Sequence, residues 1–324
     1  MGSGMSAKRW VGSVVRFRLT VPVGVLAGLV VVGSVLVRGF VSGTHIESMA
    51  DTGIFVGVLG VGQMLAIVTG GIDLSLPYMV NLSAVLIAGI SGGSDGRAAE
   101  ALAAALGVGA LVGATNGVGI GYLGIPPLVM TLAMNGVLEG ITLLYTGGTP
   151  FGSAPPVVVG AASGHAGPVT VGVWIWMGVS VLAAVVLVRT TFGRRIFAVG
   201  AAPRAAVLSG VRRPRVLVGV YCIVSVLGAL GGALLVGYAG QAFIGMGDEY
   251  LLVSVAVVVI GGASIYGGSG DVLGTFIGSC VIIVLTDLLV LLNLGQNWQD
   301  VIYGGVILSV LVGARGVSGK RSMT

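Results

Sequence analysis

Charged side chains are scarce in this chain. Its 324 residues include 16 Lys and Arg and 11 Asp and Glu, so 8% carry a formal charge, whereas soluble domains have about 25%. A soluble domain of this size could not cover its surface with so few charges. The scarcity excludes a soluble enzyme, a disordered chain and a nucleic-acid-binding module, despite a net charge of +5.

Groups for disulfides, metals or ATP hydrolysis are also few. Cys222 and Cys280 lie in apolar runs, which does not indicate a disulfide framework. His45 and His165 lie in polar stretches and are expected in exposed loops, and with the cysteines they supply too few ligands for a metal site. The chain has no Gly-Lys-Ser/Thr phosphate loop, so any ATP that drives it must be hydrolysed by another chain.

Long apolar segments make up most of the sequence, and a helix that crosses the hydrocarbon core needs about 20 such residues. The windows without charge, divided at Pro126-Pro127 and at the Gly- and Pro-rich stretch 146–168, predict an all-α polytopic membrane protein. Its ten predicted spans lie near residues 20–41, 52–70, 77–93, 99–121, 126–145, 169–189, 216–239, 250–265, 272–292 and 299–314.

The basic residues predict the orientation, because cytoplasmic loops are enriched in Lys and Arg. Fourteen of the sixteen fall in three blocks, separated by six and then four spans, so all three lie on one side. The blocks are Lys8, Arg9, Arg16 and Arg18; Arg189, Arg194, Arg195, Arg204, Arg212, Arg213 and Arg215; and Arg315, Lys320 and Arg321. We therefore expect a cytoplasmic segment 1–19, one transmembrane domain 20–314 with a cytoplasmic loop 190–215, and a cytoplasmic tail 315–324. The expected outer loops carry acids: Glu47, Asp51, Asp95, Glu100, Asp248, Glu249 and Asp300.

Glycines recur every four residues in the fourth span, at Gly109, Gly113, Gly117 and Gly121. Such a stripe lets the backbone of a neighbouring helix approach closely, so we interpret it as a packing surface.

Polar side chains at membrane depth are costly and tend to face an interior. The candidates for a solute path are Gln63, Asp73, Asn81, Asn135 and Glu139. Asn135 and Glu139 are one helical turn apart and share a face. Each could instead be bonded to a neighbouring helix, and Asp73, in the glycine-rich break 70–77, is expected to cap the helix that follows.

The loop 190–215 contains a predicted short helix. Pro203 suits a first turn and Gly210 an end, with basic flanks on both sides. The helix either anchors to anionic lipids or docks a cytoplasmic partner.

Five motifs in order give the chain, over roughly residues 20–315, a resemblance to the ribose-permease-like family, the permease subunits of bacterial ABC importers for monosaccharides. They are Gly70-Gly71-Ile72-Asp73-Leu74-Ser75; Ile125-Pro126-Pro127-Leu128-Val129-Met130-Thr131-Leu132; Thr146-Gly147-Gly148; residues 192–200 with Pro203 and Ser209-Gly210-Val211; and residues 257–264 followed by Gly267-Gly268-Ser269-Gly270.

The resemblance implies a permease dimer in the inner membrane, two cytoplasmic ATPase subunits that bind ATP–Mg, and an extracytoplasmic sugar-binding protein. It also implies that the short helix couples to the ATPase. The implied coupling residues are Gly200, Ala202, Pro203, Arg204, Ala205, Leu208 and Gly210. The sequence departs from the family pattern at Ala202, where Asn is common, and at Leu76-Pro77.

We expect import of a monosaccharide or small polyol by alternating access, with no chemistry by this chain. Two alternatives stay open. One is a related permease for branched-chain amino acids or nucleosides, although a zwitterion would call for a charge pair in the path. The other is a proton-driven secondary transporter using Glu139 or Asp287. An intramembrane enzyme lacks support, because neither a metal cluster nor a nucleophile–base pair is evident.

Overall fold

Helices dominate the computed structural model, which describes residues 4–149 and 151–319, with side chains described for 19–149 and 151–309. The elements are α1 (Gly4–Leu36), α2 (Gly43–Val68), α3 (Leu76–Ser91), the 3-10 helix η1 (Asp95–Arg97), α4 (Ala98–Gly121), α5 (Pro127–Thr146), α6 (Pro156–Ser163), β1 (His165–Ala166), β2 (Val169–Thr170), α7 (Val171–Arg189), α8 (Thr191–Ala201), α9 (Pro203–Leu208), α10 (Arg213–Ala239), α11 (Tyr250–Ile260), α12 (Val272–Leu291) and α13 (Gln296–Gly319). The side chains of the first and third basic blocks lie outside the described residues.

The ten predicted spans correspond in order to α1, α2, α3, α4, α5, α7, α10, α11, α12 and α13. Among the described residues, seven helices are long and apolar enough to cross a membrane. Two of the ten helices, α3 with 16 residues and α11 with 11, are shorter than the length that a crossing needs. The all-α polytopic fold is confirmed, and the number of complete crossings stays a prediction.

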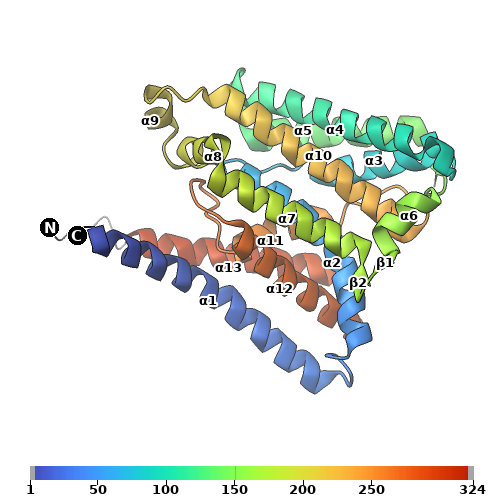
Figure 1. Ribbon diagram of the computed structural model, residues 1–324, viewed down its shortest axis with the longest axis horizontal. Coiled ribbons are helices and arrows are strands. Elements are labelled where there is room, and N and C mark those ends of the chain that lie inside the picture. Colours follow the sequence, from blue (N-terminus) through green and yellow to red (C-terminus); the bar gives the residue numbers. More distant parts are fainter. Residues whose placement is uncertain (1–3, 150, 320–324) are drawn as a thin grey trace.

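Burial separates central helices from peripheral ones. In α2, 89% of the apolar window is buried, and in α10 and α12 the share is 61%. The shares for α1 and α5 are only 11% and 17%, and α1 lies along the edge of the bundle (Figure 1). The core therefore forms around α2 and α10, and α5 presents most of its surface outward.

The predicted glycine stripe packs against α10. A Cβ atom on Gly113 would overlap the carbonyl oxygen of Tyr221, and one on Gly121 would lie 2.9 Å from the Cα of Pro214. Gly109 and Gly117 face the α10 backbone in the same way. The interpretation of the stripe as a packing surface is confirmed.

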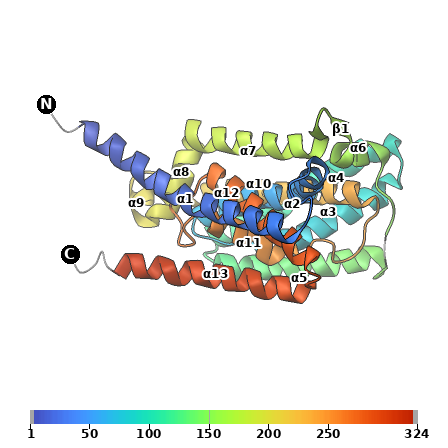
Figure 2. The ribbon, with the colours of Figure 1, turned by 90° about the horizontal axis from the view of Figure 1, so that it is seen from below.

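The two ends of the bundle carry different elements. The first turns of α1, the last turns of α13, and α8 and α9 lie at one end, which we call the α9 end (Figures 1 and 2). The β1–β2 hairpin and α6 lie at the other, the hairpin end. This arrangement agrees with the even numbers of spans between the basic blocks.

Two expectations at the hairpin end are wrong. The helix α2 begins at Gly43, nine residues before the predicted start, so His45 lies in a helix and not in a loop. Its Nε2 atom is 2.9 Å from Oδ2 of Asp287 on α12. His165 lies in β1 rather than a loop, is exposed as expected, and its Nε2 is 2.7 Å from Oε1 of Glu47.

Candidate functional site

The segment 240–249, between α10 and α11, turns back from the hairpin end into the bundle. It starts beside residues 151–154, where the Phe151 N–H donates to the Ala242 carbonyl at 3.1 Å. A Cβ on Gly152 would lie 3.1 Å from the carbonyl carbon of Ala88, which places this pairing beside the last turn of α3.

The same segment ends beside the first turns of α3. The Gly247 N–H donates to Oδ1 of Asn81 at 2.6 Å, and Nδ2 of Asn81 donates to Oδ1 of Asp248 at 3.0 Å. Ala88 and Asn81 are seven residues apart, or about 10 Å along a helix. Asp248 therefore lies about 10 Å further along α3 than Ala242, and the short α11 follows it.

Two further side chains complete a polar cluster around Asp248, which we call the Asn81 cluster: Tyr78, Asn81, Glu139 and Asp248. The Tyr78 hydroxyl of α3 interacts with the Glu139 carboxylate of α5 and lies near Asp248. Irregular backbone at membrane depth is tolerated where it is buried in protein or lines a cavity, and broken helices mark solute sites in transporters.

The cluster opens on one face of the bundle. Glu139 and Asp248 are exposed, whereas Asn81 is fully buried behind them. The helix α5, which carries Glu139, lies on the same side of the bundle as α13, opposite α7 (Figure 2). Carboxylate, carboxamide and phenol groups on one surface can donate to and accept from the hydroxyl groups of a polar solute.

The other candidates for the solute path, Asn135, Gln63 and Asp73, lie in different parts of the molecule. Asn135 lies on α5 one turn from Glu139, as expected, and its buried Oδ1 has no partner. Gln63 is completely buried in α2, and both polar atoms of its carboxamide are unpartnered. The structure therefore joins Asn81 and Glu139, but assigns Gln63 to the core.

Asp73 belongs to a separate buried group at the α9 end. Its Oδ1 accepts from Ser75 N at 2.8 Å and Ser75 Oγ at 2.5 Å, and Asn116 Nδ2 donates to Ser75 Oγ at 3.0 Å. Burial raises the pKa of the Asp73 carboxyl to about 6, although the hydrogen bonds from Ser75 oppose that rise. The expected cap is wrong, because Ser75 is itself the N-cap residue of α3 and Asp73 bonds to it rather than to the first turn.

Three glycine-containing segments meet beside Asp73, and we call this contact the glycine junction: residues 68–71, 200–201 and 267–268. The Gly268 N–H donates to the Val68 carbonyl at 2.8 Å. A Cβ on Gly200 would overlap that carbonyl, and one on Gly268 would lie 2.6 Å from the Cα of Ala201. Only glycine permits this approach, so the end of α8 is joined to the breaks that precede α3 and α12.

The predicted short helix in the basic loop exists as α9, preceded by α8, which the sequence did not predict. Pro203 opens α9, Gly210 follows it with a φ of 82°, and Ala202 provides no side-chain cap. Leu208 is 89% exposed. Val207 of the same helix is 53% exposed, so α9 presents two adjacent apolar side chains between basic flanks.

The sequence analysis did not identify Tyr78 as a site residue, and it assigned Asp248 to an outer loop. The length of the predicted span 250–265 could have indicated that Asp248 lies deeper, because this apolar run is too short for a complete crossing.

Comparisons with known proteins agree with this architecture. Residues 45–311 match the family described as branched-chain amino acid transport system / permease component. The ribose import permease protein of Bacillus subtilis is 35% identical over 293 residues, covering 86% of this chain and 87% of that protein. The ribose import permease protein of Escherichia coli strain K12 is 35% identical, covering 79% and 81%. The fructose import permease protein of Rhizobium meliloti is 31% identical, covering 89% and 82%. No solved structure matches the chain.

Proposed function

The chain belongs to this family of importer permease components, as a multi-pass inner-membrane protein, and we propose that it forms the membrane pathway of an ATP-driven importer for an uncharged monosaccharide. The Asn81 cluster is the observation that carries this proposal. It gathers two carboxylates, a carboxamide and a phenol from α3, α5 and the broken segment 240–249.

The chemistry of the cluster favours a sugar over an amino acid. A zwitterion needs a cation for its carboxylate and an anion for its ammonium group, whereas the side chains that interact with Asp248 are Asn81, Glu139 and Tyr78, none of which is a cation. Hydrogen-bond acceptors that have no cation beside them suit the hydroxyl groups of a sugar better than the charged groups of an amino acid. The ribose and fructose permeases among the relatives support the same substrate class.

The outward face of α5 supports a second permease subunit, either a copy or a relative of this chain. Glu139 is exposed there, on a helix whose apolar window is only 17% buried. A carboxylate at membrane depth is costly in lipid and faces an interior or a water-filled cavity. A second subunit opposite α5 would enclose such a path, along which access alternates between the two sides.

The α9 end is the proposed cytoplasmic end, where α9 docks on an ATPase subunit. A sugar-binding protein delivers solute at the hairpin end. Leu208 and Arg204 are exposed on α9, and the glycine junction connects α8 to the break before α3.

Uptake by the reconstituted importer tests the pathway. In proteoliposomes that contain this permease, its ATPase and its binding protein, we expect ATP-dependent uptake of ribose or fructose. Asp248→Asn removes one charge with little change in shape and should reduce uptake about tenfold or more, since a hydrogen bond to a charged group contributes about 1.5–3 kcal/mol. Glu100→Gln, at an exposed ion pair with Arg97, is the control and should transport normally.

Uptake that needs no ATP and collapses with the proton gradient would contradict the proposal and favour a secondary transporter. Normal uptake by Asp248→Asn would remove the Asn81 cluster from the pathway.

A matched pair tests the docking surface. Leu208→Ser should weaken ATPase binding by about thirtyfold, as expected for the loss of an interface anchor, without unfolding the chain. Val41→Ser, also exposed but located at the hairpin end, should have no effect. Equal ATPase recovery with both variants would exclude α9 as the docking helix.

A further inference from the structure

A cavity of about 310 Å³ lies beside the end of segment 240–249, and none of the four residues of the Asn81 cluster lines it. It is bounded by α2, α10, α12 and the first turns of α11 and α13, toward the hairpin end. Glu249 lines the cavity, and its neighbour Asp248 belongs to the Asn81 cluster. The end of segment 240–249 therefore contributes the Glu249 carboxylate to the cavity and the Asp248 carboxylate to the Asn81 cluster.

Aromatic side chains form part of the cavity wall. The ring of Phe55 lies 5.5 Å from that of Tyr238 and 6.4 Å from that of Tyr250, both in edge-on geometry. Tyr303 also lines the cavity, and its hydroxyl is 2.6 Å from the Thr286 hydroxyl. Rigid rings with polar tips provide an apolar surface for the C–H face of a sugar ring and partners for its hydroxyl groups.

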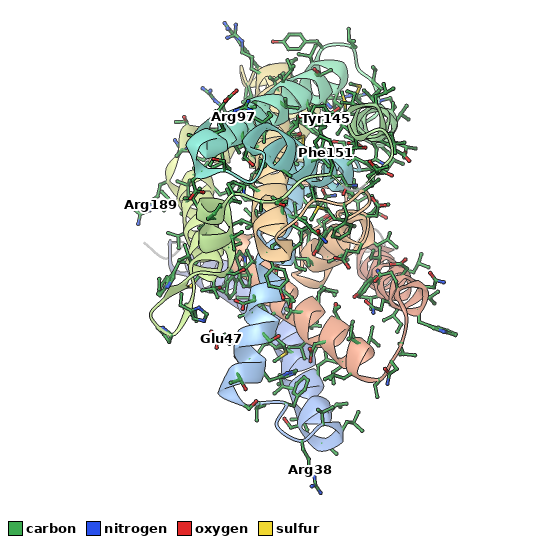
Figure 3. The ribbon with its side chains drawn as sticks, turned by 90° about the vertical axis from the view of Figure 1, so that its right-hand side faces the viewer. Arg38, Glu47, Arg97, Tyr145, Phe151 and Arg189 are labelled. Atoms are coloured by element: carbon green, nitrogen blue, oxygen red, sulfur yellow. The ribbon has the colours of Figure 1, made fainter. Side chains whose placement is uncertain are left out.

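The polar lining carries negative charge and carboxamides. Glu249 interacts with the Tyr250 hydroxyl, and Gln296 and Gln299 lie at the start of α13. Asp287 is also part of the lining, and His45 binds it from outside the cavity. The lining residues include neither Lys nor Arg, and the two arginines at this end, Arg38 and Arg97, lie at separate edges of the molecule (Figure 3). Such a cavity repels phosphate and carboxylate groups.

The volume limits the size of the ligand. Cavities that bind small molecules have volumes of about 300–1,000 Å³, so this one, at the lower end, suits a single sugar ring better than a disaccharide.

We propose that this cavity is a binding site for an uncharged monosaccharide, and that it holds the solute on the hairpin side before the solute reaches the Asn81 cluster. The inference rests on the proposed function and assigns the substrate class and charge selectivity to named residues. Glu249 excludes anionic sugars, and Tyr238 and Gln296 contact the ring.

Direct binding to the purified full chain in lipid nanodiscs tests this site without the ATPase. Saturation-transfer NMR would compare D-ribose, D-fructose, D-xylose, D-glucose and ribose 5-phosphate. We expect at least one neutral sugar to bind, with ribose 5-phosphate about tenfold or more weaker than ribose because of charge repulsion. Glu249→Gln should reduce that difference to about threefold or less.

A matched pair of variants locates the site. Gln296→Ala and Tyr238→Ala should each weaken binding of the neutral sugar about tenfold. Gln296 and Tyr238 are both exposed in part, so neither substitution opens a core void. Asn297→Ala removes the adjacent exposed carboxamide, which does not line the cavity, and should leave binding unchanged.

Failure to bind any of the four neutral sugars would overturn the inference, and so would binding by Gln296→Ala and Tyr238→Ala as tight as that of the unsubstituted chain. So would binding of ribose 5-phosphate as tight as that of ribose. Because no ATP is involved, these results are independent of whether uptake by the whole importer is ATP-driven.

Discussion

Gly113→Ala is the sharpest test of how the bundle is packed. Alanine is favoured over glycine in a helix interior by about 0.8–1.0 kcal/mol, so propensity alone predicts a gain in stability. The new Cβ, however, would overlap the Tyr221 carbonyl and lie 2.5 Å from the Cα of Cys222. Non-bonded carbon atoms are optimally separated by about 3.5–4.0 Å, so α4 and α10 would have to move apart by about 1 Å or more.

Gly107 on the same helix is the matched control, because a Cβ there would have nothing within 4 Å. Overpacking a close contact costs about 1–3 kcal/mol, which offsets or exceeds the propensity gain at Gly113 only. We therefore expect the free energy of unfolding of Gly113→Ala to lie about 1–3 kcal/mol below that of Gly107→Ala.

The assay heats both variants in mild detergent and measures the fraction that remains monodisperse by size-exclusion chromatography. The half-loss temperature of Gly113→Ala should be lower by several degrees, at about 2–4 °C per kcal/mol. Equal half-loss temperatures would refute the reasoning, because they would mean that α4 and α10 do not meet at this glycine.

Three further substitutions test buried groups at Gln63, Asp73 and Gly200. Gln63→Met removes two unpartnered polar atoms from the core and should raise stability by about 1–3 kcal/mol, seen as a higher half-loss temperature; a lower one would mean that the carboxamide has a partner. The raised pKa of Asp73, about 6 against 3.8, means that the unfolded chain ionises first as pH rises. Stability should therefore fall between about pH 4 and pH 6 by about 3 kcal/mol, and Asp73→Asn should abolish that slope in melts at pH 4.5 and 7.5. Gly200→Ala should displace α8 from Val68 and reduce ATP-coupled uptake. Gly160→Ala is the control and should not reduce uptake, because a Cβ at Gly160 would have no atom within 4 Å. Equal uptake by the two variants would contradict the proposed role of the glycine junction in coupling.

Charge-free windows predicted helix positions because a charged side chain is costly in an apolar surrounding. The rule failed at the start of α2, where Glu47 and Asp51 lie within the helix. Both acids have polar partners at the hairpin end: His165 for Glu47 and the Thr170 hydroxyl for Asp51, each at 2.7 Å. An acid marks the end of an apolar window, but a helix can extend past it where such partners exist.

The glycine stripe was predictable as a packing surface because spacing along one helix determines one face. Its partner was not predictable, since nothing in the spacing of Gly113 identifies Tyr221. The Asn81 cluster was not predictable for the same reason, because Asn81 and Asp248 are separated by 167 residues. Their meeting depends on segment 240–249 turning back, which local sequence patterns do not determine.

The glycine junction lies close to the proposed solute site along the chain. Gly70 and Gly71 are followed by the buried group of Asp73 and Ser75, and Tyr78 comes three residues after Ser75 on α3. The Gly247 N–H bonds to Asn81 one turn further along. A displacement of α8 by a bound ATPase would therefore act on the first turns of α3, which hold two residues of the Asn81 cluster, through packed backbone rather than through flexible side chains. If the three segments move together, the first turns of α3 carry Asn81 with them, whereas Asp248 lies on segment 240–249 outside the junction, so the distance between Asn81 and Asp248 would change.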